Sequence, residues 1–284
     1  MSYEQRNEEH LFHAFALGAG GYIERDRKRK PIRLAAPNAL SVSGGSGSCC
    51  LRDYEFVFRD PDKTRGSDFY MTIGEVVTEV AATELEDRWL TTGRVELINV
   101  DINGVVKADR VRGVLNSTHH KRTSLRDPKT EATISALGSE FENLTVNGIP
   151  IRLTRDEAIE SHPTHEKLWK FLSGKDNAAK AFRLCHFLEE SERKDDYVCD
   201  MERFNNESIF RCSIFGEVAL ERESKDVKSH CYSLDIKDFG RLYVGEIIVS
   251  QGSKRLNMLR FDLGCDNCGG GTGGSVDVNG ETMP

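Results

Sequence analysis

Apolar and polar residues alternate through most of the first half of the chain. The segment "YEFVFRD" (54–60) places two phenylalanines at strand spacing, and "DFYMTIGEVVTEVAATEL" (68–85) is rich in Val, Ile and Thr. In "TGRVELINVDINGVVKADRVRGVL" (92–115), the pair Asn103-Gly104 is typical of a hairpin turn. Long β-branched runs broken by Gly and Asn predict a mainly β chain that folds as an antiparallel β-sandwich-like domain.

The pattern changes to helical spacing at Thr154. "TRDE" has the form of a capping box, in which the Thr154 hydroxyl and the Glu157 carboxylate each bond a backbone N–H group of the other residue. "THEKLWKFLSG" (164–174) predicts a short helix, and apolar residues recur at helical spacing in "NAAKAFRLCHFLEESERK" (177–194). We therefore expect a helical insertion over residues 154–193.

Strand patterning returns in four later segments: "SIFRCSIFGEVAL" (208–220), "HCYSLDI" (230–236), "FGRLYVGEIIVS" (239–250) and "KRLNMLRFDLG" (254–264). Residues 1–153 and 194–268 are thus expected to be two parts of one sandwich domain. Beyond Cys268 the composition is mainly Gly, Thr, Ser and Asn without apolar periodicity. Such a segment buries too little surface to offset its ordering entropy. Residues 269–284 are therefore predicted to be a flexible, glycine-rich tail.

Two segments repeat the pattern F-x-x-L-x-V-x-x-I-x-[I/V]: "FENLTVNGIPI" (141–151) and "FGRLYVGEIIV" (239–249). Each follows an acidic residue, Glu140 or Asp238. Any two half-buried strands with a turn can match in this way, but a duplicated β unit would leave the same trace. Both interpretations stay open at the level of sequence.

Two motifs follow one another in residues 98–152. The first, G-x-V-x-A-D-x-V, and the second, F-x-N-L-x-V-x-G-x-P-[I/V], are carried by Gly104, Val106, Ala108, Asp109 and Val111, then Phe141, Asn143, Leu144, Val146, Gly148, Pro150 and Ile151. This region resembles the β-rich module of bacterial choice-of-anchor proteins, and residues 239–264 resemble the end of uncharacterised bacterial proteins with the same hairpin. The resemblance implies an all-β fold and a bacterial source, and it carries no established activity. Such proteins are typically exported and surface-anchored, whereas neither a signal nor an anchor is evident in this sequence.

Composition narrows the classes of partner. The chain has 284 residues and a net charge of −7, with a pI of about 5.7. An acidic surface repels phosphate backbones, so we expect no nucleic-acid partner. No run approaches the roughly 20 apolar residues that cross a bilayer, so no membrane span is expected. The polar start "MSYEQRNEEHLFHAF" lacks secretory features and predicts a cytoplasmic protein. A surface or extracellular location is the alternative, since a mature secreted chain would look the same after residue 1.

The chain contains eight cysteines. At this length and without a secretion signal, they are expected to be free thiols. Cys265 and Cys268 form a C-x-x-C pair, which supplies two of the four ligands that zinc needs. The other candidate donors for zinc are His230, Cys231, Cys212, Cys49 and Cys50. Glycines follow the pair where a redox motif would open a helix. We interpret the pair as structural thiols, with a structural zinc site second and redox catalysis third.

Carboxylates and histidines offer further candidates. Glu75 and Glu79 lie four apart on a predicted strand and so share a face, as paired glycosidase carboxylates must. Alternating polar positions on an exposed sheet face give the same arrangement. His10 and His13, three apart on a predicted strand, should face opposite sides. The remaining histidine pairs, which we interpret as solvated loop residues, are His119-His120 and His162/His165.

No catalytic or cofactor-binding residue is assigned, and the phosphate-loop pattern G-x-x-x-x-G-K-[S/T] does not occur in the sequence. We therefore expect a non-enzymatic binding or self-assembly module, with homo-oligomers formed through edge strands or the tail. One alternative is a carbohydrate-directed hydrolase with carboxylates on a sheet face. Another is a small structural metalloprotein that uses Cys265 and Cys268.

Overall fold

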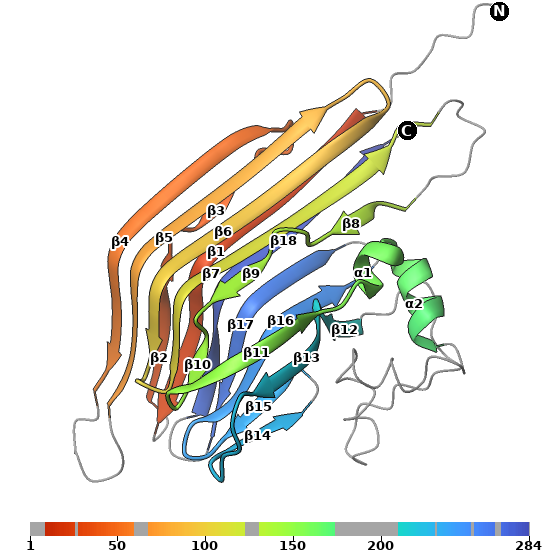
Figure 1. The fold of residues 1–284 in the computed structure, drawn as a ribbon. Coiled ribbons are helices and arrows are strands. Elements are labelled where there is room, and N and C mark those ends of the chain that lie inside the picture. The colour runs from red at the N-terminus through yellow and green to blue at the C-terminus, as the bar shows by residue number, and fades with distance from the viewer. Residues whose placement is uncertain are drawn as a thin grey trace, which may run out of the picture.

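The computed structural model describes residues 9–25, 28–59, 68–122, 131–173, 210–230, 232–250, 253–264 and 268–283. Within these residues the chain forms two antiparallel sheets of nine strands each, packed face to face (Figure 1). The predicted mainly β, sandwich-like architecture is therefore confirmed.

Sheet 1 brings the first and last described strands together. Its main path is, in order, β14 (Val227–His230), β15 (Ser233–Ile236), β16 (Gly240–Val249), β17 (Lys254–Leu263), β18 (Cys268–Met283), β1 (Glu9–Arg25) and β2 (Lys28–Ala35). Two short strands complete the sheet, β12 (Phe210–Ser213) beside β16 and β3 (Asn38–Ala39) beside β1. The pairing of β1 with β18 extends from Glu9↔Met283 to Glu24↔Cys268. Both ends of the described chain therefore contribute a central strand.

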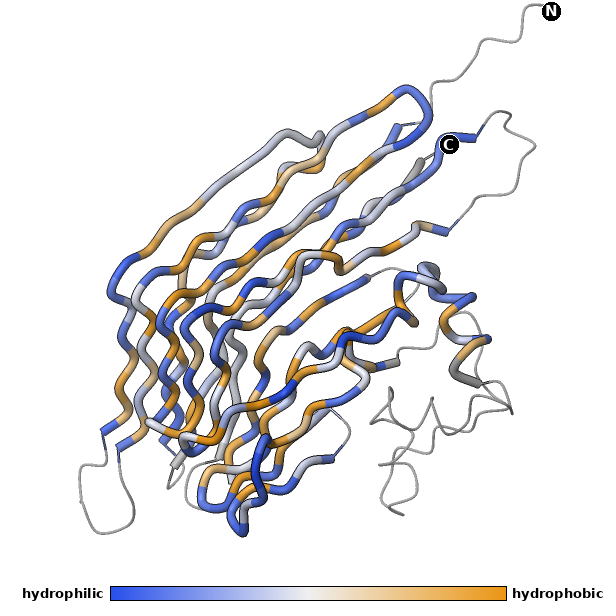
Figure 2. Tube along the Cα trace, viewed as in Figure 1, coloured by the Kyte–Doolittle hydropathy of each residue, from blue (hydrophilic) through white to orange (hydrophobic). Residues whose placement is uncertain are grey.

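Sheet 2 is built from the middle of the chain. Its main path is β13 (Phe215–Leu220), β11 (Ile149–Arg155), β10 (Thr145–Val146), β7 (Val106–His120), β6 (Arg88–Ile102), β5 (Phe69–Glu84) and β4 (Gly45–Phe58). β8 (Thr133–Ser135) and β9 (Glu140–Glu142) pair with β7. Hydrophobic and hydrophilic residues alternate along β4 to β7 in Figure 2, so one face of each strand is apolar. β1 and β18 of sheet 1 pack against β5, β6 and β7 across the core.

Two short helices follow β11. They are α1 (Ala158–Ser161) and α2 (His165–Ser173). The capping box predicted at Thr154 was wrong, because Thr154 still pairs with β13, and the Oδ1 atom of Asp156 accepts the Ala158 N–H at 2.7 Å instead. The helix predicted from residue 177 onward lies outside the described residues. Neither helix in the described part of the chain is long and apolar enough to span a membrane.

The flexible tail expected over residues 269–284 was wrong as far as residue 283. This segment is β18, which pairs with β17 on one side and with β1 on the other, and its Val276 is fully buried. Its glycines fit a narrow space: a Cβ on Gly270 would lie 2.5 Å from the carbonyl oxygen of Phe261. Two flanking strands supply the hydrogen bonds and buried surface that offset the ordering entropy.

A shared bend crosses sheet 2, and Figure 1 shows β4 to β7 bending together. The bend passes through one residue of each strand that the strand pairings skip. These residues are Asp53 in β4, Gly74 in β5, Asn99 in β6 and Asp109 in β7. The bend ends at Asn143, in the connection between β9 and β10. Asp53, Asn99 and Asn143 adopt φ angles of 51°, 55° and 51°, in the left-handed region that Asn and Asp tolerate better than most residues. Asn143 Nδ2 also donates to Asp109 Oδ2 at 2.6 Å.

Sheet 1 bends in the same way. The residues that its pairings skip are Gly245, Met258, Gly274 and Gly18. Gly245 and Gly274 have φ angles of 62° and 72°, which cost glycine little. In both sheets the left-handed residues therefore lie on alternate strands along the bend.

The bend shifts the alternation of buried side chains by one residue. β6 buries odd-numbered positions from Trp89 to Leu97 and then the even-numbered Val100 and Ile102. Because neighbouring long strands make this shift at the same level, the pairing continues on both sides of the bend. The inward face consequently stays apolar along the whole strand.

Glycines on one sheet accommodate side chains from the other. A Cβ on Gly93 of β6 would lie 2.3 Å from Val276 Cγ1 of β18, and a Cβ on Gly18 of β1 would lie 2.2 Å from Val76 Cγ1 of β5. Neither distance is compatible with a real side chain at the glycine. Side chains of each sheet therefore fill the space left by glycines of the other sheet. In an interior packed this closely, adding one methyl group is expected to lower the stability of the protein.

The two motifs in residues 98–152 form neighbouring strands. The first covers the β6–β7 turn and the start of β7, and the second covers β9, β10 and the start of β11. β9 and β10 both pair along β7. The polar motif residues Asp109 and Asn143 bond each other at the bend. In this chain the motifs therefore have a structural role.

The two segments with the repeated pattern do not fold alike. Residues 141–151 cover parts of three strands and a turn at Asn147-Gly148, whereas residues 240–249 form the single strand β16. The hypothesis of a duplicated β unit was therefore wrong.

Substitution of Asn99 tests the bend. We expect Asn99→Val to lower the free energy of unfolding by about 1–2 kcal/mol, because a β-branched residue is poorly accommodated at positive φ. Asn99→Gly is the matched control and should stay within about 0.5 kcal/mol of the parent. Urea unfolding measures both values. Equal stability of the two variants would contradict the assigned backbone geometry.

A double-mutant cycle tests the interlock between Gly93 and Val276. Gly93→Ala should destabilise by about 1–3 kcal/mol through overpacking, and Val276→Ala by about 2 kcal/mol through lost burial. Their combination should cost at least about 1 kcal/mol less than the sum, because the smaller residue at 276 makes room for the new methyl group. Gly264→Ala is the control, since the atom nearest to a Cβ at this position would lie at an ordinary 3.5 Å. Strictly additive effects would show that positions 93 and 276 do not contact each other.

Candidate functional site

The residues proposed for a zinc site are only partly described. Cys265 and Cys231 lie outside the described residues, and Cys268 begins β18 opposite Glu24. His230 Nε2 lies 3.2 Å from Asp235 Oδ2 on the neighbouring strand. No three His, Cys, Asp or Glu side chains gather in metal-binding geometry within the described ranges. The zinc site stays a prediction.

The paired carboxylates on β5 belong to an ion-pair surface. Glu75 binds Arg52 at 3.2 Å, and Glu79 binds Arg94 at 3.1 Å. Four residues along a strand span about 13 Å, which exceeds the separation of the carboxylates in glycosidases. Glu96 lies next in the row, bonded to Arg94 and Arg110, and these bonds outweigh burial and lower its pKa. A lowered pKa makes Glu96 a poor proton donor.

The two histidines of each predicted pair lie in different environments. His10 is turned into the sandwich and is 6% exposed, whereas His13 is exposed on the outer face, so the prediction of opposite faces is confirmed. His162 stacks on Phe171 with ring centroids 4.2 Å apart. The interpretation of His165 as a solvated loop residue was wrong, because it is buried at the start of α2.

A groove of about 590 Å³ lies on the outer face of sheet 1, the face turned away from sheet 2. One wall is apolar and consists of Phe15, Leu17 and Leu34 from β1 and β2. Leu34 is 52% exposed and is one of few large apolar residues at the described surface. The floor contains Gly20 and Gly270, whose missing side chains keep the groove open.

The opposite wall is polar and its charges are already paired. Arg260 donates to both carboxylate oxygens of Glu246, at 2.7 and 3.0 Å, and to Asp262 at 2.7 Å. Arg255 donates twice to Asp277, at 3.1 and 2.9 Å. Burial would lower the pKa of Arg260, but the bonds to fully buried Glu246 raise it well above its ordinary value. The arginines are therefore fixed charges with fixed orientations.

Buried amide and hydroxyl groups lie beneath this wall. Ser275 Oγ donates to Asn257 Oδ1 at 2.9 Å, and Asn257 Nδ2 lies 3.5 Å from Glu246 Oε2. Asn257 is 3% exposed and Ser275 is 7% exposed. A connected network of this kind holds the wall rigidly from β16 to β18.

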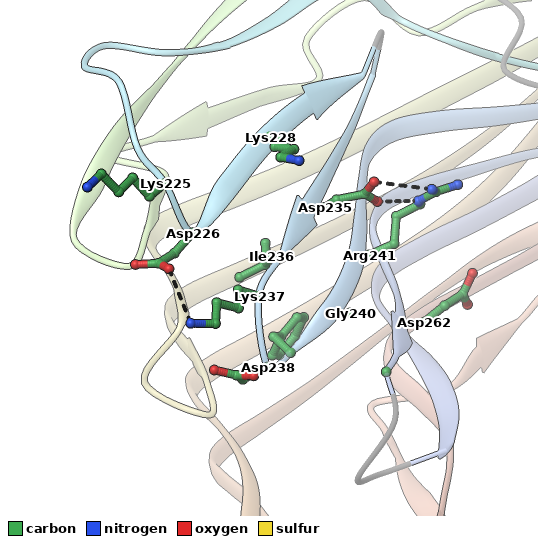
Figure 3. A pocket seen from close by; sticks show the side chains of 12 residues that line it. Lys225, Asp226, Lys228, Asp235, Ile236, Lys237, Asp238, Gly240, Arg241 and Asp262 are labelled. Carbon is green, nitrogen blue, oxygen red and sulfur yellow. Dashed lines mark hydrogen bonds and ion pairs between the residues drawn. The ribbon is translucent and has the colours of Figure 1, made fainter.

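A second hollow, of about 640 Å³, continues the same surface around β14, β15 and the start of β16 (Figure 3). Asp235 accepts two bonds from Arg241, at 2.5 and 3.3 Å, and this pairing raises the pKa of Arg241. Lys237 Nζ lies 3.8 Å from Asp226 Oδ1. Asp262 lines both the hollow and the groove, so the two depressions adjoin.

Sequence reasoning missed the groove. Its residues come from β1, β2, β16, β17 and β18, which lie far apart in the chain. One signal was available in "KRLNMLRFDLG": the polar residues Arg255, Asn257, Arg260 and Asp262 alternate with apolar ones, with a one-residue shift at the bend. Because of that shift, the polar residues do not follow one continuous two-residue period along the segment.

His119 lies in a buried polar region between the sheets. Its ring centroid is 4.7 Å from that of His10, which in turn stacks on Trp89 at 4.7 Å. Among the described residues, His119 Nδ1 has no hydrogen-bond partner. Burial lowers the pKa of His119 to about 4, and the positive charges of His10, Lys254 and His120 act in the same direction.

These features define a two-sheet antiparallel β protein with a groove of mixed character on one outer face. Residues 10–250 match the family described as a domain of unknown function (DUF8256), and the chain belongs to that family. The match ends at residue 250, one residue after the end of β16. Strands β17 and β18, which carry part of the groove, therefore lie beyond it. No curated protein and no solved structure matches the chain.

The lowered pKa of His119 predicts acid sensitivity. Its folded pKa of about 4 lies below the ordinary value of 6.5, so the folded state binds fewer protons between these values. The contribution of His119 to stability is complete above about pH 6.5 and is lost as the pH falls toward about 4. From about pH 7.5 to about pH 5, His119 should lower the free energy of unfolding by about 1–2 kcal/mol, after allowance for its partial exposure.

Urea unfolding at both pH values, with two variants, checks this contribution. His119→Phe should remove it, whereas His120→Phe, at the adjacent exposed position, should retain it. An unchanged pH dependence in His119→Phe would exclude His119 as its source.

Proposed function

We propose that the protein is a non-enzymatic β-sandwich binding module, of bacterial origin as the resemblance implies, that holds an oligosaccharide in the outer-face groove of sheet 1. The observation that carries this proposal is the pairing of an apolar wall with a polar wall whose charges are internally compensated. The groove is formed by rigid strands, which suits a preformed binding site.

The two walls match the two surfaces of a sugar ring. Pyranose rings present apolar C–H faces and hydroxyl edges. Phe15, Leu17 and Leu34 offer apolar surface to the faces. Arg255 and Asp262 offer hydrogen-bonding groups to the edges, and the side chain of each is 52% exposed.

Charge pairing favours a neutral ligand. An anionic ligand on Arg260 or Arg255 would compete with Glu246 or Asp277, which already occupy these guanidinium groups. Both carboxylates are almost completely buried, so displacing them would leave a buried charge without its partner. The net charge of −7 acts in the same direction.

The same pairing supports a non-enzymatic role. A hydrolase of the two-carboxylate type needs one carboxyl group that is protonated at working pH. Glu246, Asp262 and Asp277, the carboxylates around this groove, each accept hydrogen bonds from an arginine. Each of these three carboxylates is therefore already engaged by a side chain of the protein.

The groove-filling substitution Thr272→Trp tests the proposal. Thr272 lines the groove between Gly20 and Arg260, so an indole there should occupy the ligand's place without entering the core. A panel of neutral oligosaccharides (cello-, xylo-, manno-, chito- and β-1,3-gluco-oligosaccharides) is titrated by calorimetry. We expect at least one to bind the parent and to bind Thr272→Trp at least about tenfold more weakly.

Thr72→Trp is the matched control, because Thr72 is a half-buried residue in a strand of sheet 2 that pairs on both sides. It should bind like the parent. Failure of the whole panel to bind would reject an oligosaccharide ligand. Binding that survives Thr272→Trp would locate the sugar elsewhere on the protein.

A further inference from the structure

β4 is the edge strand of sheet 2, and its two halves differ in how the free edge is protected. It pairs with β5 alone among the described strands. An edge strand presents unpaired N–H and C=O groups, which proteins normally guard with charges, bulges or covering segments. The bend at Asp53 divides β4 into a first half, Gly45–Leu51, and a second half, Tyr54–Phe58.

The second half and the bend carry several such guards. Lys30 Nζ donates to the carbonyl oxygen of Val57 at 2.7 Å, and the Tyr54 hydroxyl donates to the carbonyl of Arg33 at 2.6 Å, so β2 is held against this half. Arg52 adds a charge next to the bend. These features oppose pairing with another strand.

Among the described residues, no side chain bonds the backbone of the first half in this way, although Asn38 of β3 lies close to Gly47. Its sequence, "GSGSCCL", contains no charged residue and no proline. The residues at its outer positions are small, and Ser46, Ser48 and Cys50 are all exposed. In an antiparallel pair of identical Gly45–Leu51 segments, only the central residue, Ser48, faces its own copy, and Ser46 faces Cys50 of the other copy. A neutral segment of small residues avoids both repulsion and steric conflict.

Two exposed apolar residues flank the start of this half. Val42 is 63% exposed and lies in the turn that leads into β4. Leu85 is 39% exposed and directly follows β5, whose Ala82 pairs with Gly45. Few large apolar side chains are exposed at the described surface, and two of them lie at this end of the free edge.

We propose that two copies of the chain pair through Gly45–Leu51 of β4 as antiparallel strands, related by a twofold axis. The occupant is a second copy because the segment is compatible with itself in charge and in size. The pairing would join the two copies of sheet 2 into one continuous sheet and bring the partner's strand to the end of β4 near which Val42 and Leu85 are exposed. This inference is independent of the ligand groove.

Sedimentation across a wide range of concentrations tests the pairing. A reducing agent is included so that Cys49 and Cys50 cannot crosslink the copies. We expect a reversible dimer for the parent. Ser48→Lys sets like charges against each other at the centre of the segment and should weaken the dimer at least about tenfold. Ser46→Lys, nearer the end, is a second edge variant with the same expected direction.

Thr72→Lys is the matched control, since it adds the same charge to a strand that is paired on both sides, and it should dimerise like the parent. Circular dichroism and urea unfolding confirm that each variant is folded. A parent that stays monomeric overturns the proposal. So does a dimer that survives both edge substitutions, or one that Thr72→Lys disrupts equally.

Discussion

The bend that crosses both sheets is the constraint on which the rest of the structure depends. A strand that turns without an added residue would expose its apolar side chains beyond the turn. Here each long strand adds one residue at the same level, and left-handed residues such as Asn99 and Gly274 absorb the change of direction. The groove lies across this line in sheet 1, with Leu17 and Ser275 on one side and Thr272 on the other. The feature that keeps the core apolar therefore also shapes the candidate binding surface.

Close packing between the sheets explains the second unusual feature, the number of glycines in central strands. Gly113 faces Met258 in the same way that Gly93 faces Val276: a Cβ on Gly113 would lie 2.8 Å from Met258 Cγ. Glycine in a strand normally costs stability, because it gains no packing and loses more chain entropy. In this sandwich the cost is offset by the neighbour's side chain, which occupies the empty space. The glycines at these positions of β6 and β7 are therefore a packing requirement.

The sequence supports some of these conclusions and not others. Alternation in segments such as residues 68–85 predicts the fold class, because a half-buried sheet imposes that pattern directly on its strands. The last strand was mistaken for a tail, because glycines carry no side-chain pattern and the partners of β18 include a strand at the other end of the chain. The groove was out of reach for the same reason, since Phe15 and Asp277 become neighbours only when β1 pairs with β18. The bend left a trace in polar residues such as Asn99 inside strands, which resembles an ordinary turn signal.

The two proposed surfaces are geometrically compatible. Identical edge strands that pair antiparallel are related by an axis perpendicular to their sheet, so corresponding faces of both copies point the same way. In the proposed dimer, the grooves on the outer faces of the two copies of sheet 1 would therefore open toward the same side. A polymer with repeated binding units could then engage both grooves, and the second contact would form at a high effective concentration. Modest affinity at each groove would suffice, which fits a shallow site whose charges are already satisfied within the protein.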